Sequence, residues 1–127
     1  MTNYITAQFA AILGLLMAAL AMNVSRIRIK EKVSMGDGGI KPLIGAMRAH
    51  GNAFESIPII IILLFFYETQ GGNSQIIWTI GVVYTISRFL HAWGMIGHNF
   101  LLRRLSAAIN YLVGMDLPLL ILFELYK

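Results

Sequence analysis

Four long apolar stretches, separated by short polar segments, dominate the chain. Each contains about 20 mostly apolar residues, the length that an α-helix needs to cross the hydrocarbon core of a bilayer. The stretches run from Tyr4 to Ser25, from Pro42 to Tyr67, from Gln75 to Gly97 and from Leu105 to Tyr126. Because the segments between them are short, the pattern predicts an all-α fold: an integral-membrane four-helix bundle that forms one domain over residues 1–127.

Turn and helix-start signals separate the apolar stretches. Gly-Asp-Gly-Gly at 36–39 interrupts the chain before the second stretch, and Pro42 suits the first turn of a helix because its missing N–H has no partner there. Gly-Gly-Asn-Ser at 71–74 indicates a tight turn, in which Asn73 or Ser74 can cap the third helix.

Composition and charge support a membrane protein and predict its orientation. The chain is 57% hydrophobic and only 13% charged, whereas about a quarter of the residues in a soluble domain are charged. The basic residues of the first and third polar segments and of the adjoining stretch ends are Arg26, Arg28, Lys30, Lys32, Lys41, Arg103 and Arg104. The second polar segment has no lysine or arginine, so the positive-inside rule predicts that both termini face away from the cytoplasm.

The same charge pattern bears on two alternatives. Ala-Leu-Ala at 19–21 resembles the cleavage site of a signal peptide, but no basic residue precedes Tyr4, so we expect the first stretch to be retained. The basic excess is explained by membrane orientation, and no other feature indicates a nucleic-acid partner. Without cysteines the chain has no thiolate nucleophile of its own, and its histidines are not spaced as metal ligands.

Charged and amide side chains recur at helical spacing inside two of the apolar stretches. Arg48, Asn52 and Glu55 stand at i, i+4 and i+7, which places them on one face of the second helix. Arg88 and His91, separated by three residues, share a face of the third. Such residues are costly in a membrane and usually face the bundle interior or a polar cavity, so they indicate a functional site.

The polar residues are predicted to lie at one depth, near the cytoplasmic side, where Arg26, Arg103 and Arg104 would complete a cationic ring. A structural alternative is that Arg48–Glu55 and Arg88–Asp116 are ion pairs that only hold the helices together. The histidine nearest to the polar face in sequence, His50, lies about 200° around the helix from Arg48, so it is predicted to pack rather than to bind.

A cationic pocket with an amide and a carboxylate suits a small anionic zwitterion. Guanidinium groups bind carboxylates, and Glu55 can bind an ammonium group. Glutathione has these groups and a thiol, and a nearby guanidinium favours the reactive thiolate. An apolar second substrate could reach such a site from the lipid.

The stretch Arg-Ala-His-Gly-Asn-Ala-Phe-Glu-Ser-Ile-Pro at 48–58 resembles the second-helix motif of the MAPEG family, the membrane-associated proteins of eicosanoid and glutathione metabolism. Gly-Asp-Gly-Gly at 36–39 and Ser-Arg-Phe-Leu-His-Ala-Trp-Gly at 87–94 are similar to the small bacterial members. The resemblance covers essentially the whole chain. It implies a homotrimer that binds glutathione between neighbouring subunits on the cytoplasmic side.

The resemblance also implies roles for individual residues. The positions that match the family's glutathione-binding residues are Arg26 or Arg28, Arg48, Asn52, Glu55, Arg88 and His91. Of Arg103 and Arg104, the family pattern favours Arg104 as the arginine that stabilises the thiolate.

Two departures from the family pattern narrow the predicted activity. Eicosanoid-synthesising members have a tyrosine at the position of Met95. Leukotriene synthases have a tyrosine at the position of Ser56. The sequence therefore favours transfer of glutathione to a lipophilic electrophile, with peroxidase activity toward hydroperoxides as an additional reaction. Two alternatives remain open: a small transporter that uses Glu55 as its coupling carboxylate, and a catalytically inactive member that only binds glutathione.

Overall fold

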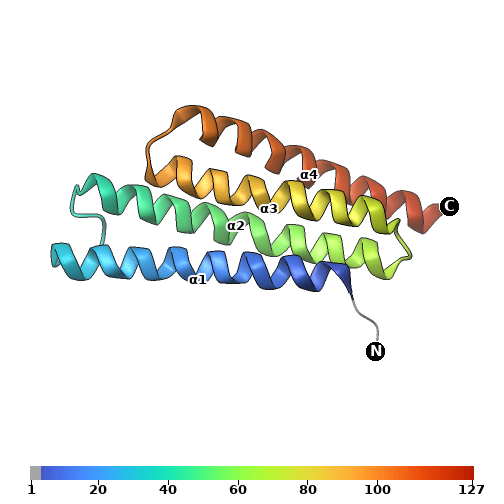
Figure 1. The fold of residues 1–127 in the computed structure, drawn as a ribbon, viewed down its shortest axis with the longest axis horizontal. Coiled ribbons are helices and arrows are strands. Elements are labelled where there is room, and N and C mark those ends of the chain that lie inside the picture. The colour runs from blue at the N-terminus through green and yellow to red at the C-terminus, as the bar shows by residue number, and fades with distance from the viewer. Residues whose placement is uncertain (1–3) are drawn as a thin grey trace.

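The computed structural model describes residues 4–127 as four antiparallel helices (Figure 1). In chain order they are α1 (Ile5–Glu31), α2 (Lys41–Thr69), α3 (Ser74–Ile96) and α4 (Phe100–Tyr126). The central helices α2 and α3 pack on each other; α1 contacts both from one side and α4 contacts both from the other. Over the described residues α1 and α4 do not touch, so the bundle is an open layer rather than a closed ring. The predicted all-α architecture is confirmed.

The two basic connections lie at the same end of the bundle. Figure 1 shows the α1–α2 and α3–α4 connections together at one end, and the start of α1, the end of α4 and the α2–α3 turn at the other. This arrangement follows from four antiparallel helices joined by short segments. The cytoplasmic orientation of this basic end stays a prediction.

Three of the four helices between residues 4 and 127 are long and apolar enough to cross a membrane: α1, α2 and α4. Four such helices were expected from the sequence, and α3 falls short because Arg88, His91, Tyr84 and the serines and threonines of this helix lower its mean hydropathy. Most of this polarity points inward, since Tyr84, Ser87, Arg88 and His91 are all buried. These polar side chains of α3 are therefore covered by the neighbouring helices.

Local capping explains where the last two helices begin. The Asn73 side chain accepts a hydrogen bond from the Gln75 backbone N–H at 2.8 Å, which confirms Asn73 as the cap of α3. Asn99 caps α4 in the same way. As a result α4 begins at Phe100 rather than at Leu105, and its first turns include Arg103 and Arg104, which were predicted to lie in a loop.

The N-terminus of α1 is capped by a residue far away in sequence. The Glu68 carboxylate, near the end of α2, accepts hydrogen bonds from the backbone N–H groups of Ile5 at 2.6 Å and Thr6 at 2.9 Å. A negative charge at a helix N-terminus is favoured by the exposed N–H groups and by the helix dipole. Glu68 thus joins the first two helices at the end opposite to the basic connections.

Replacing Glu68 with alanine should lower the free energy of unfolding by about 1–2 kcal/mol, the usual cost of losing a helix cap. Denaturant titration of the detergent-solubilised protein measures this change. The control is Gln70→Ala, two residues further along the chain and exposed, which should leave stability nearly unchanged. Equal stability of the two variants would show that the capping contacts contribute nothing.

Candidate functional site

The polar face predicted on α2 lines a groove on the surface of the protomer. Arg48, Asn52 and Glu55 border this groove, which has a volume of about 510 Å³ and is completed by Met47, Gly51 and Met95. Arg48 and Glu55 are exposed, whereas Asn52 is partly buried. The structure therefore brings the three predicted residues together, and we call this the α2 groove.

A second groove lies between α2 and α4 and shares two residues with the first. It has a volume of about 590 Å³, and Asn52, Glu55, Ser56 and Asn110 form its polar part. The rest of its wall is made by Ile59, Ile60, Tyr111, Gly114 and Met115. We call it the α2–α4 groove. Asn52 and Glu55 thus lie where a polar groove and a largely apolar groove meet.

Behind the α2 groove lies the buried guanidinium of Arg88, which is only 2% exposed. Its Nη1 donates hydrogen bonds to Asn52 Oδ1 and Ser56 Oγ, each at 3.0 Å. Its Nη2 makes a longer contact of 3.5 Å with the Ser106 carbonyl. Arg88 and His91 were predicted to lie at the same depth as the polar face of α2, and the hydrogen bonds of Arg88 connect α3 to that face directly.

His91 lies one turn from Arg88 and contacts the same residue of α4. Its Nδ1 is 3.0 Å from Ser106 Oγ. The Ser106 hydroxyl also donates to the backbone carbonyl of Leu102, so it links His91 to the first turns of α4. The other ring nitrogen, Nε2, is buried and has no hydrogen-bond partner within the described part of the protein.

Helix α4 contributes to this polar core through residues that were not among the candidates predicted from the sequence. Besides Ser106, Asn110 takes part, because its Oδ1 accepts a hydrogen bond from the Tyr84 hydroxyl at 3.2 Å. The Tyr84 ring also lies 5.6 Å from the guanidinium carbon of Arg88, within the range of a cation–π contact. The sequence does indicate this face of α4, because small and polar residues recur there at every fourth position: Ser106, Asn110 and Gly114.

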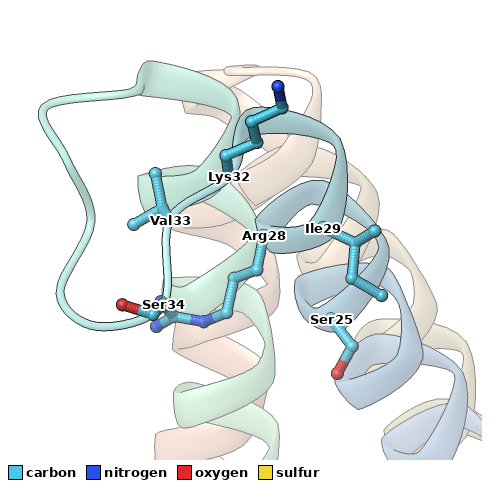
Figure 2. Close-up of a pocket in the computed structure, with 6 residues that line it drawn as sticks. All are labelled: Ser25, Arg28, Ile29, Lys32, Val33 and Ser34. Atoms are coloured by element: carbon cyan, nitrogen blue, oxygen red, sulfur yellow. The ribbon is translucent and has the colours of Figure 1, made fainter.

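Of the two candidate arginines on α1, Arg28 lies nearer to the α2 groove. Its Nη1 donates to the Gly36 carbonyl at 2.8 Å, and its Nη2 is 3.5 Å from Met47 Sδ in the groove wall. Figure 2 shows the side chain extending from α1 to a position beside Ser34 in the connecting segment. Arg28 therefore fixes this connection against α1 and borders a shallow surface cavity of about 490 Å³.

Arg26 lies in a different groove, together with Lys30, Pro42 and His98. Its guanidinium donates to Asn23 Oδ1 at 2.9 Å. Within one protomer the structure therefore does not bring Arg26 to the face formed by Arg48, Asn52 and Glu55.

The two arginines at the start of α4 differ in their surroundings. Arg103 packs along the α3–α4 hairpin. The Cγ atom of Arg103 lies so close to Gly94 that a Cβ placed on this glycine would be 3.1 Å away. Arg104 is exposed and does not line either groove of its own protomer. It is therefore the arginine of this pair that is free to contact a bound ligand or a neighbouring copy.

The ion pairs considered as a structural alternative are not formed within residues 4–127. The salt bridges found there join Lys30 to Glu31 and Lys127 to Glu124, both outside the polar core. Arg48, Glu55 and Asp116 are all exposed on the protomer. His50 lies against the Phe54 ring, as expected for a packing role.

These features define the class of the protein: an integral-membrane helical protein with a polar site formed inside membrane-length helices. The chain matches the MAPEG family over residues 6–123, and it belongs to that family. It is 36% identical over 100 residues to the inner membrane protein YecN of Escherichia coli K12, covering 79% of this chain and 76% of that protein. The YecN protein of Escherichia coli O6:H1 is similar to the same extent.

Proposed function

We propose that this protein is an integral-membrane glutathione transferase that activates the glutathione thiolate for attack on a lipophilic electrophile. The observation that carries the proposal is the α2 groove, where Arg48, Asn52 and Glu55 lie together with the Arg88 cation directly behind Asn52. Family membership supports it, because the same residues form the motif through which the sequence resembles glutathione-binding members.

The chemistry of the groove matches the functional groups of glutathione. Arg48 can bind a carboxylate through two hydrogen bonds, and Glu55 can bind the ammonium group of the same ligand. A thiolate formed nearby is stabilised by a further guanidinium, for which the exposed Arg104 is the best candidate.

The complete site is proposed to require a second copy of the chain. Arg48, Glu55 and Asp116 are exposed on helices that are embedded in the membrane, where contact of a charged group with lipid is unfavourable. A neighbouring copy would cover these groups and could bring Arg26 or Arg104 to the α2 groove. The family resemblance favours three copies, and hence a homotrimer with sites between subunits.

The second substrate is proposed to be apolar and to reach the site from the membrane. The α2–α4 groove supports this, because Ile59, Ile60 and Met115 form an apolar wall that ends at Asn52 and Glu55. A lipophilic electrophile or hydroperoxide there would lie next to glutathione in the α2 groove. YecN is named an inner membrane protein, and we propose the same location for this protein, with the active site toward the cytoplasm and both termini on the other side.

Replacing Glu55 with glutamine tests the proposal. The wild-type protein should bind glutathione saturably in isothermal titration calorimetry, and Glu55→Gln should weaken binding at least about tenfold, because the ligand ammonium loses the negative charge of Glu55. The control is Glu124→Gln, which changes a carboxylate paired with Lys127 far from the groove.

The opposite result would support the transporter alternative. If wild-type protein binds no glutathione, and if Glu55→Gln abolishes proton-coupled export from proteoliposomes, then Glu55 is a coupling carboxylate and the transferase proposal is wrong.

A further inference from the structure

Arg88 is a buried cation without a carboxylate partner. It is 2% exposed, and no carboxylate oxygen in residues 4–127 lies within 4.0 Å of its guanidinium, since the salt bridges found there involve other residues. Burying a charge costs desolvation free energy, and without an opposite charge nearby this cost is not offset by an ion pair. Its partners are instead neutral groups on α2 and α4.

The contact between Arg88 and Asn52 determines which way the Asn52 amide faces. A guanidinium has only donors, so the Asn52 atom that lies 3.0 Å from Arg88 Nη1 must be the carbonyl oxygen Oδ1. The amide NH₂ of Asn52 then points away from Arg88. Ser56 supports this arrangement, because its hydroxyl accepts from Nη1 and donates to the Asn52 backbone carbonyl at 2.8 Å.

The side of Asn52 that faces away from Arg88 belongs to the grooves. Asn52 lines both the α2 groove and the α2–α4 groove, and Glu55 lines both with it, one turn further along the helix. At this point the groove wall presents two N–H donors beside a carboxylate. A ligand that carries a carbonyl or carboxylate oxygen close to an ammonium group is complementary to this pair.

We propose that Arg88 is a positioning residue: it holds the Asn52 amide with its N–H donors toward the ligand, and the site thereby selects an acceptor group next to an ammonium group. This inference rests on the proposed glutathione binding, and it deepens it. The α-amino-acid end of the γ-glutamyl group has a carboxylate and an ammonium on one carbon, so this end of glutathione occupies the Asn52–Glu55 wall. Arg88 itself does not touch the ligand, because its side chain is buried behind Asn52.

A double-mutant cycle tests the role of Arg88. Glutathione affinity is measured by calorimetry for the wild type, Arg88→Gln, Asn52→Ala and the double variant. If Arg88 acts through Asn52, each single variant should weaken binding about tenfold, the effect of losing one hydrogen bond to a charged group. The double variant should then bind no more weakly than Asn52→Ala alone. Arg88→Lys, which keeps a cationic donor, should recover part of the affinity.

Asn52→Asp provides a test that does not depend on a change at Arg88. An aspartate can pair with the Arg88 cation, so the melting temperature should be maintained or raised, but the groove loses both N–H donors. We expect this variant to bind glutathione as weakly as Asn52→Ala does. If Arg88 had a purely structural role, Asn52→Asp would keep its affinity for glutathione because it keeps its stability.

Three results would overturn the inference. Additive losses in the double-mutant cycle would mean that Arg88 acts independently of Asn52, and wild-type affinity in Asn52→Asp would mean that the donors are not used. Both leave the proposed glutathione binding intact. Absence of binding to the wild-type protein would instead remove the proposed function together with this inference.

Discussion

Replacing Arg104 with glutamine should slow glutathione conjugation about a hundredfold at saturating glutathione, because removal of one donor that stabilises a reacting anion typically has an effect of this order. Glutathione affinity should change much less, since Arg48, Asn52 and Glu55 still bind the rest of the molecule. The measurement is the turnover of glutathione with a chlorinated aromatic electrophile, with the oligomeric state of each variant checked by size-exclusion chromatography.

Two further variants make the Arg104 result specific. Lys41→Gln removes an exposed positive charge from the same end of the bundle and should leave the rate nearly unchanged. Arg103→Gln separates the two neighbouring arginines, and a greater loss there than in Arg104→Gln would assign the thiolate to Arg103. If the wild-type protein binds glutathione but does not turn over, the protein is a glutathione-binding member without transferase activity.

Replacing Gly81 with alanine should lower the free energy of unfolding by about 3 kcal/mol, at the upper end of the usual cost of overpacking a core. The Phe9 ring of α1 lies directly on Gly81 of α3, and a methyl group at this position would overlap several ring atoms. The ring cannot move aside easily, because it also packs edge-on against Trp78. Denaturant titration in detergent measures the loss.

Gly14→Ala is the matched control for this variant. A Cβ at Gly14 of α1 meets nothing within 4 Å, so this change should stabilise the helix by about 0.5–1 kcal/mol. Adding Phe9→Ala, which removes the ring, should restore part of the stability lost in Gly81→Ala. If Gly81→Ala were as stable as Gly14→Ala, the close contact between α1 and α3 would not exist in the folded protein.

Helical periodicity was sufficient to predict the polar face of α2. Residues at i, i+4 and i+7 share a face in any α-helix, so the grouping of Arg48, Asn52 and Glu55 does not depend on tertiary structure. The number of helices followed for a similar reason, because the apolar stretches have the length of a membrane span. Their ends were less predictable, since α4 gains its first turn from a side-chain cap at Asn99.

The partners of Arg88 could not be predicted, because they depend on how three helices are aligned. Asn52 and Ser56 reach it from α2 and Ser106 from α4, and a shift of either helix by one turn would replace them. Pairing by charge alone suggested Asp116, which instead lies exposed on the outer side of α4. Small polar residues such as Ser106 give a weak signal in sequence, although they determine the hydrogen bonding of the core.

The cap at Glu68 has a consequence for biosynthesis. The N–H groups that it binds belong to the first turn of α1, but the carboxylate itself is made 63 residues after Ile5. During synthesis the first helix must therefore cross the membrane with this turn uncapped, and the hydrogen bonds can form only after the second helix has been inserted beside it. Correct pairing of the first two helices is thus completed at the end of the bundle opposite to the basic connections.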